Sequence, residues 1–331
     1  MSSEVESAVA ALRAGRLVAF PTETVYGLGA DASNDEAVRR VFAVKGRPTD
    51  HPLIVHIADG SLLHQWATRV TSTAQLLADA LWPGPLTLLV ERSSTVSSAV
   101  TGGRSTVGIR VPDHPIALAL LNSFGGGIAA PSANRFGRVS PTTAAHVVAD
   151  LGSDVDLVLD GGPCRVGVES TIVDLTGEVP LVLRTGGVPV SDIAEIIGHS
   201  VAVHASAEPS GSGARAPGML EAHYAPAAQV VLADEHEVID VLIDVSARTN
   251  GPVGVLAGCC LPGLPEGIIE LEPAGNTEEF AAVLYSRLRQ ADRLGLGTVV
   301  CVPPPAVGIG LAVNDRLRRA AASGRRFGTT R

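Results

Sequence analysis

One lysine stands out among the residues that could take part in chemistry. Lys45 is the only lysine in a 331-residue chain that carries 25 lysine and arginine residues in total. An ammonium on a flexible stem presents a compact charge that the planar guanidinium of arginine does not reproduce. Lys45 and Arg47 flank a glycine, and two cations at this spacing suit a polyphosphate. A pair of solvated charges at a helix end is an equally simple interpretation.

Further polar side chains occur within or just after apolar runs. Arg110 lies inside the apolar segment 106–112, and a buried arginine needs an anion, which could be a ligand or a carboxylate of the protein. The other side chains of this kind are Thr22, Thr24, Tyr26, Ser132, Asn134, Ser170 and Arg184. Together they suit an anionic nucleotide and a small polar co-substrate, and a reaction driven by positioning and charge neutralisation, such as nucleotidyl transfer.

Several other chemistries are excluded by motif. The only lysine lies in Val44-Lys45-Gly46, so the chain has no Walker A loop. GxSxG, HExxH and CxxC motifs are absent as well. Cys259 and Cys260 are adjacent in an apolar run, and we expect them to be buried thiols of a protein from a reducing compartment.

Composition and the first residues bear on location. The net charge is −9, which provides no overall basic surface for nucleic acid. The N-terminal segment lacks a basic start followed by an apolar core, so we expect no signal peptide. No stretch approaches the ~18 apolar residues that suggest a membrane span. We therefore expect a cytoplasmic protein that has no membrane partner.

Apolar runs and helical periodicity alternate along the first 200 residues, which predicts an α/β fold with a mixed sheet. Asn34 is predicted to cap a helix that Gly46 ends. Strands are expected at 17–22, 53–57, 86–91, 106–111, 127–132, 157–160, 170–175 and 181–184, and further helices near 5–12, 72–81, 115–122, 142–151 and 191–197.

The composition changes near residue 205. Residues 205–218 are small, polar and rich in glycine and proline, as in a linker. Four later apolar runs and a long amphipathic helix at 276–294 predict a smaller, parallel, Rossmann-like α/β domain, although no GxGxxG follows its first strand. For Asn314, Arg316 and Arg318 we favour structural packing over a docking role. The predicted division is a catalytic domain at 1–204, a linker or lid at 205–227 and a C-terminal domain at 228–331.

At this point the chain resembles a known family. The blocks PTETVYGLG, KGRP, LWPGPLTLL, TVGIRVP, APSAN with SPTTA, VESTIVD and LRTGG look like the signature of the YrdC-like domain, in family order, over about residues 5–200. APGMLEAHYAP and NDRLRRAA resemble the linker and the end of the long, two-domain form. The chain is therefore similar to the L-threonylcarbamoyladenylate synthases.

This resemblance implies a reaction. L-Threonine, bicarbonate and ATP would give threonylcarbamoyl-AMP and pyrophosphate. A separate transferase complex would then use the product to modify an adenosine of tRNA; whether this chain itself binds tRNA is left open. Mg²⁺ would come with the ATP phosphates rather than on protein side chains, and no organic cofactor is implied.

The resemblance also implies roles for particular residues. Lys45 would act in catalysis against the phosphates and the forming carbamate. The threonine pocket would be lined by Thr24, His56, Arg110, Ser132 and Ser170. ATP would be held by Arg47, His51, Thr106, Asn134, Thr142, Arg184 and, from the linker, Tyr224. The family often has asparagine at the position of His51, which affects the pH dependence expected of that contact.

Two other functions are weighed against this one. Single-domain relatives are associated with double-stranded-RNA binding and ribosome maturation, but residues 1–200 carry 14 basic and 20 acidic side chains, which disfavours a phosphate backbone. Hydrogenase-maturation proteins use a similar domain in carbamoyl transfer, but they carry extra zinc-finger segments with CxxC pairs that are absent here.

Overall fold

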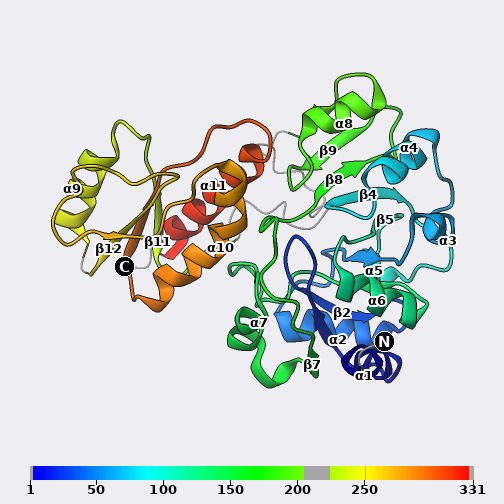
Figure 1. Cartoon of the computed structure of the whole chain (residues 1–331). Helices are drawn as coiled ribbons and strands as arrows, with labels where there is room; N and C mark the ends of the chain where they lie inside the picture. The colour runs from blue at the N-terminus through cyan, green and yellow to red at the C-terminus, as the bar shows by residue number, and fades with distance from the viewer. Residues whose placement is uncertain (1–2, 205–223, 250, 328–331) are drawn as a thin grey trace. The chain divides into compact units, whose positions relative to one another are not determined.

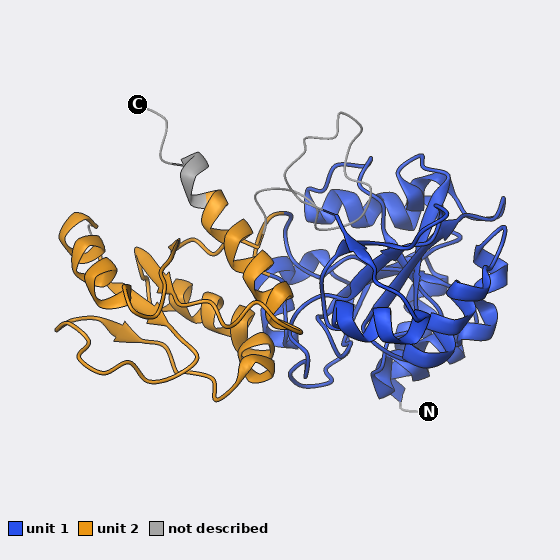
Figure 2. Cartoon of the chain, turned by 90° about the horizontal axis from the view of Figure 1, so that it is seen from above, with its two compact units in different colours: residues 1–136, 140–219 blue, residues 137–139, 220–331 orange. Residues whose placement is uncertain are grey.

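The computed structural model describes residues 3–204, 224–249 and 251–327. The chain divides into two compact units (Figure 2). Unit 1 comprises residues 1–136 and 140–219, and unit 2 comprises residues 137–139 and 220–331. The predicted linker falls largely on residues 205–223, outside the described residues, so its boundaries remain a prediction.

Unit 1 is built on a ten-stranded sheet of mixed direction (Figure 1). The strand order is β10-β9-β8-β4-β5-β3-β6-β2-β1-β7. Pairs such as β3/β5 and β4/β8 are parallel, whereas β4/β5 and β3/β6 are antiparallel, which confirms the predicted mixed sheet. The strands are β1 (Val18–Phe20), β2 (Gly27–Asp31), β3 (Ile54–His56), β4 (Leu86–Glu91), β5 (Thr106–Arg110), β6 (Ile128–Ala129), β7 (Leu157–Val158), β8 (Thr171–Asp174), β9 (Leu181–Arg184) and β10 (Ala202–Val203).

The six longer helices that the structure describes in unit 1 agree closely with the predicted ones, whereas the four-residue helices at 63–66 and 98–101 were not predicted. They are α1 (Ser3–Arg13), α2 (Asp35–Lys45), α3 (Leu63–Trp66), α4 (Ser72–Leu81), α5 (Ser98–Thr101), α6 (Pro115–Phe124), α7 (Ala144–Leu151) and α8 (Val190–Ile197), with 3₁₀ turns η1 (Gly60–Leu62) and η2 (Gly152–Asp154). Asn34 Oδ1 accepts the backbone N–H groups of Glu36 and Ala37, each at 3.1 Å. Gly46 ends α2 in the left-handed conformation, with φ 64°. Both predicted caps are confirmed, and they make Lys45 the last residue of the helix.

The alternation of side chains along the central strands separates two faces of the sheet. Val55, Leu88 and Ile109 belong to the main apolar core. The opposite face carries a smaller apolar cluster made of Ile54, Leu89, Ile172 and Leu183. Arg110 and His56 have the same parity as Ile54 and Gly108, so they continue this second face toward the ends of β5 and β3.

Two of the described strands of unit 1 were not predicted, β2 and the short edge strand β10. Gly27 and Gly29 carry no strand signal in the sequence, yet residues 27–31 form β2, between β1 and β6. A Cβ on Gly29 would lie 2.8 Å from Ile128 Cγ2 and 2.9 Å from Phe20, so only glycine fits between its neighbours. The strand is therefore specified by close packing in the sheet rather than by local propensity.

Unit 2 contains a four-stranded, all-parallel sheet in the order β11-β14-β12-β13. Its strands are β11 (Gln229–Leu232), β12 (Val253–Leu256), β13 (Ile269–Glu270) and β14 (Thr298–Cys301), and its helices are α9 (Val238–Arg248), α10 (Thr277–Arg293) and α11 (Gly310–Phe327). This confirms the smaller Rossmann-like domain. Asn314 and Arg316 are buried as predicted for packing residues, while Arg318 on the same helix is exposed.

The predicted burial of Cys259 and Cys260 is wrong. Both side chains are exposed because they lie in the loop that follows β12 and not in the strand itself. Among the described residues, no helix is both long enough and apolar enough to cross a membrane.

Candidate active site

The loop between β1 and β2 is organised by Thr22. Its hydroxyl accepts the backbone N–H groups of Thr24 and Val25 at 3.2 Å and donates to Val25 O at 2.6 Å. The hydroxyl oxygens of Thr22 and Thr24 lie 2.8 Å apart. Because the single proton of Thr22 goes to Val25 O, Thr24 must donate in that contact. Thr24 can then only accept hydrogen bonds from other groups.

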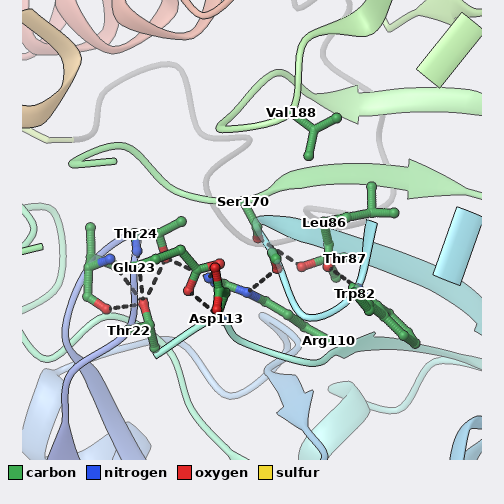
Figure 3. A network of polar contacts seen from close by, with 12 residues as sticks. Thr22, Glu23, Thr24, Trp82, Leu86, Thr87, Arg110, Asp113, Ser170 and Val188 are labelled. Atoms are coloured by element: carbon green, nitrogen blue, oxygen red, sulfur yellow. Dashed lines mark hydrogen bonds and ion pairs between the residues drawn. The ribbon is translucent and has the colours of Figure 1, made fainter. Parts of the chain in front are cut away.

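Arg110 is fixed on two of its three side-chain nitrogens (Figure 3). Nε donates to Gly84 O at 3.3 Å, and Nη2 donates to Thr24 Oγ1 at 2.9 Å. Nη2 also lies 2.8 Å from Glu23 Oε1. Nη1 has no partner among the described residues. The interpretation that a protein carboxylate accompanies Arg110 is confirmed, and Nη1 is left for a second anion.

His56 lies beside Arg110, since the two residues pair in the register of β3 and β5. Burial, and then the charge of Arg110, lowers the pKa of His56 to about 3. The imidazole is therefore neutral at neutral pH. Its Nδ1 finds no hydrogen-bond partner in the described part of the chain. A neutral ring in this position does not compete with Arg110 for an anion.

Ser170 and Arg184 form a second group on the same sheet. Arg184 Nη2 donates to Ser170 O at 2.8 Å and to Ser170 Oγ at 3.1 Å. The Ser170 hydroxyl also lies 2.8 Å from Thr87 Oγ1, on β4. Figure 3 shows Thr87 and Ser170 in the same network as Arg110 and Thr24. The structure thus brings together Thr24, Arg110, Ser170 and Arg184, as expected from their positions near strand ends.

Lys45 is buried at the end of α2. Its ammonium donates to two backbone carbonyls, Ser132 O and Asn134 O, each at 2.5 Å. Burial, followed by the charge of Arg47, lowers the pKa of Lys45 well below its usual range. The 132–134 segment also joins the loop before β2, because Ala133 N donates to Tyr26 O at 2.8 Å. An anion placed at Lys45 would favour its charged form.

Arg47, His51 and Phe136 form a third group. The Arg47 guanidinium lies 5.8 Å from the centroid of the Phe136 ring, and Nη2 donates to Pro52 O at 3.0 Å. The His51 and Phe136 rings are in edge contact, 5.6 Å apart at their centroids. Burial, and then Arg47, lowers the pKa of His51. Phe136 was not predicted as a site residue, because a single aromatic residue in a loop carries no sequence signal.

The remaining predicted residues of unit 1 lie in different surroundings. Thr142 is buried, with its hydroxyl 3.4 Å from His146 Nδ1. Asn134 Nδ2 donates to Arg135 O at 2.8 Å. Thr106 begins β5, at the opposite end of that strand from Arg110, and its side chain makes no hydrogen bond with the described residues. Among the predicted site residues that lie on strands of unit 1, Thr106 is therefore the one at the far end of its strand from Arg110.

Tyr224 belongs to unit 2. Its side chain is buried, stacks on Tyr285 with the ring centroids 5.8 Å apart, and has the Arg316 guanidinium 5.1 Å from its ring centroid. Its φ of 63° lies in the left-handed region, which is uncommon for residues other than glycine. All of these contacts lie within unit 2. The expectation that Tyr224 covers a nucleotide stays a prediction.

Sequence reasoning missed Glu23 and Thr87. Glu23 stands between two threonines that were singled out, but nothing local indicates that it meets Arg110. Thr87 is an alternating residue of an apolar strand, and only the register of β4 with β8 brings it to Ser170. Both assignments depend on strand order, which the sequence pattern did not specify.

The arrangement can bind anions rather than act as a nucleophile. Lys45, Arg47, Arg110 and Arg184 are all buried in unit 1 and held by backbone or hydroxyl oxygens. The one buried thiol of unit 1, Cys164, has its pKa raised to about 12 by burial, which disfavours the thiolate. The fold and this site define a two-domain α/β protein whose first unit is suited to hold anionic small molecules.

Two family models match the chain. Residues 10–186 match the model described as telomere recombination, of the Sua5, YciO and YrdC proteins, and residues 188–322 match the C-terminal domain of threonylcarbamoyl-AMP synthase. The chain belongs to the threonylcarbamoyl-AMP synthase family.

Relatives match over both units. The threonylcarbamoyl-AMP synthase of Pyrococcus abyssi is 42% identical over 325 residues, which cover 96% of this chain and 94% of that protein. The one of Bacillus subtilis is 40% identical, over 96% and 93% of the two chains. The crystal structure of P. abyssi Sua5 with L-threonine has a TM-score of 0.90 at 40% identity, covering 97% of this chain and 94% of that one.

Proposed function

We propose that this chain is a nucleotidyltransferase that makes L-threonylcarbamoyl-AMP from L-threonine, bicarbonate and ATP, with release of pyrophosphate. The observation that carries the proposal is Arg110, buried and fixed, with Nη1 uncommitted beside the accepting hydroxyl of Thr24. An amino acid offers a carboxylate to the first group and an amine or hydroxyl to the second. The full-length similarity to synthases supports the same reaction.

Threonine recognition follows from these atoms. Arg110 Nη1 would pair with the substrate carboxylate, and Thr24 Oγ1 would accept a proton from its amine or hydroxyl. His56, neutral because of burial, would line the pocket without repelling the amine. Ser132 and Ser170 would complete the pocket with hydroxyl groups.

The chemical step joins two substrates. The threonine nitrogen forms an N–C bond with bicarbonate and water leaves, which gives a carbamate. A carbamate oxygen then attacks the α-phosphorus of ATP, and the bond to the leaving pyrophosphate breaks. Lys45 would neutralise charge on the phosphates and the carbamate, which favours the transition state over separated anions.

The nucleotide would be held by Arg47, His51, Thr106, Asn134, Thr142 and Arg184 in unit 1 and by Tyr224. As the family resemblance implies, magnesium would enter on the phosphates as part of the MgATP substrate. The product would pass, in the cytoplasm, to a transferase complex that modifies tRNA.

A pyrophosphate assay tests the proposal. Purified protein with MgATP should release pyrophosphate only when threonine and bicarbonate are both present. Serine and valine, each lacking one feature of threonine, are matched substrate controls and should react more slowly. Equal release without threonine would refute the proposed activity.

A further inference from the structure

A carboxylate lies directly behind the arginine of the proposed threonine pocket. Glu23 is 1% exposed and extends from the loop between β1 and β2 toward Arg110, as Figure 3 shows. Its Oε1 lies 2.8 Å from Arg110 Nη2, and its Oε2 accepts the backbone N–H of Asp113 at 3.1 Å. The Glu23 carboxylate is therefore anchored at one oxygen and faces the guanidinium with the other.

The contact with Arg110 compensates charge rather than forming a directed hydrogen bond. One N–H of Nη2 donates to Thr24 Oγ1, and Glu23 Oε1 has no hydrogen-bond partner in the described residues despite its 2.8 Å distance from Nη2. A buried oxygen in that state attracts the guanidinium strongly at short range. The position of Nη2 is thus fixed by two neighbours, an uncharged acceptor and an anion.

An arginine that waits for a substrate anion needs a partner of its own. Arg110 is 4% exposed, and a buried unpaired guanidinium would cost much free energy. Glu23 supplies the compensating charge on the Nη2 side, so Nη1 remains available. Without it, Arg110 would turn toward other oxygens such as those of nearby backbone carbonyls.

We infer that Glu23 is a positioning residue for threonine recognition: it holds Arg110 so that Nη1 faces the substrate carboxylate. This inference rests on the proposed function. We assign Glu23 no contact with substrate, because its two oxygens face Arg110 Nη2 and the backbone N–H of Asp113. Its loss should therefore weaken threonine binding selectively and leave ATP binding unchanged.

The Glu23→Gln variant tests this directly. The amide keeps the size of the side chain and an acceptor for Asp113 N, but it presents an uncharged N–H group to Nη2. We expect the KM for threonine to rise about tenfold while the KM for ATP stays within about twofold. The Glu23→Asp variant keeps the charge one methylene further away, and we expect a rise of about threefold. If Glu23→Gln does not fold, the KM of Glu23→Asp for threonine tests the positioning role instead.

A neighbouring ion pair provides the control. Asp113 and Arg165 form an ion pair at the surface, and their side chains are 45% and 62% exposed. Asp113 is also the residue whose backbone N–H donates to Glu23. Arg165→Ala removes this ion pair without altering the residue that anchors Glu23, and it should leave the KM for threonine unchanged. Wild-type protein that releases no pyrophosphate with threonine would refute the proposed function instead. Active wild-type protein with an unchanged threonine KM in Glu23→Gln, or with threonine and ATP KM raised equally, would overturn the positioning role.

Discussion

The ammonium of Lys45 lies 2.5 Å from the backbone oxygen of Asn134, so the only lysine of the chain is held against the segment that carries two predicted site residues. It also donates to Ser132 O. The helix that ends at Lys45 and the segment 132–134 therefore share one cation. Their relative position should matter to catalysis as much as the charge itself.

Replacing Lys45 by alanine should abolish synthesis. We expect the rate of pyrophosphate release to fall at least about a hundredfold, because no ammonium would then neutralise the negative charge on the phosphates and the carbamate. Circular dichroism should show a folded protein. Lys45→Arg is the matched control, since it keeps the charge but not the compact shape, and it should recover little activity. Near-normal turnover in the alanine variant would contradict the role of Lys45.

Removing Arg110 should weaken both substrate binding and the fold. Arg110→Ala leaves Glu23 as an unpaired buried carboxylate, which typically costs about 3–5 kcal/mol of unfolding free energy. The double variant Glu23→Gln with Arg110→Gln removes both charges and should regain much of that stability, but no threonine binding. Denaturant titration and calorimetry would measure the two effects. A double variant no more stable than Arg110→Ala would show that the pair is not coupled.

His56 should make the stability depend on pH. Its folded-state pKa is lowered to about 3, below the ordinary value of about 6.5, so the unfolded chain binds a proton that the folded chain excludes. The contribution of neutral His56 to the free energy of unfolding is therefore fully present above about pH 6.5. It is lost as the pH falls toward 3, with a slope that approaches about 1.4 kcal/mol per pH unit.

The His56→Gln variant isolates this effect. Between pH 6.5 and 4 its unfolding free energy should fall less steeply than that of the wild type, whatever its stability at pH 7. His51 and His114, whose pKa values are also lowered by burial, remain in both proteins and cancel in the comparison. Equal slopes in urea titrations across this range would contradict a neutral, buried His56.

Tyr224 combines an observed role and a predicted one. Tyr224→Ala should destabilise unit 2 by about 3 kcal/mol, because it removes a buried ring between Tyr285 and Arg316. If Tyr224 also covers the nucleotide, the KM for ATP should rise about tenfold. Tyr285→Leu is the matched variant: it removes the stacking partner and should lower stability with a smaller effect on ATP. Unchanged ATP kinetics in Tyr224→Ala would leave that ring with a packing role alone.

Local signals specified much of the fold. Asn34 and Gly46 predicted both ends of α2 and so the place of Lys45, because caps depend on neighbouring residues. β4 and β9 were predicted at the bounds observed, since each is a short, mostly apolar run. β2 was not, because a strand with Gly27 and Gly29 forms only through its pairing with β1 and β6. The loop that exposes Cys259 and Cys260 was not predicted either, because the apolar residues before it suggested that the strand continues.

The site was predictable in its residue types and less so in its contacts. Arg110 within an apolar strand indicated a buried anion partner, and Glu23 fills that place. The sequence did not indicate which carboxylate pairs with Arg110, because that depends on the strand register that brings the end of β5 to the loop after β1. The contact between Ser170 and Thr87 likewise depends on the register of β4 and β8. Pairings between distant strands are set by the whole sheet rather than by any local sequence pattern.

Product analysis by mass spectrometry tests the central claim most directly. Protein incubated with MgATP, L-threonine and ¹³C-bicarbonate should yield threonylcarbamoyl-AMP that carries one labelled carbon, and Lys45→Ala should yield none. AMP without a labelled threonylcarbamoyl group, or no adenylate at all from folded wild-type protein, would contradict the account.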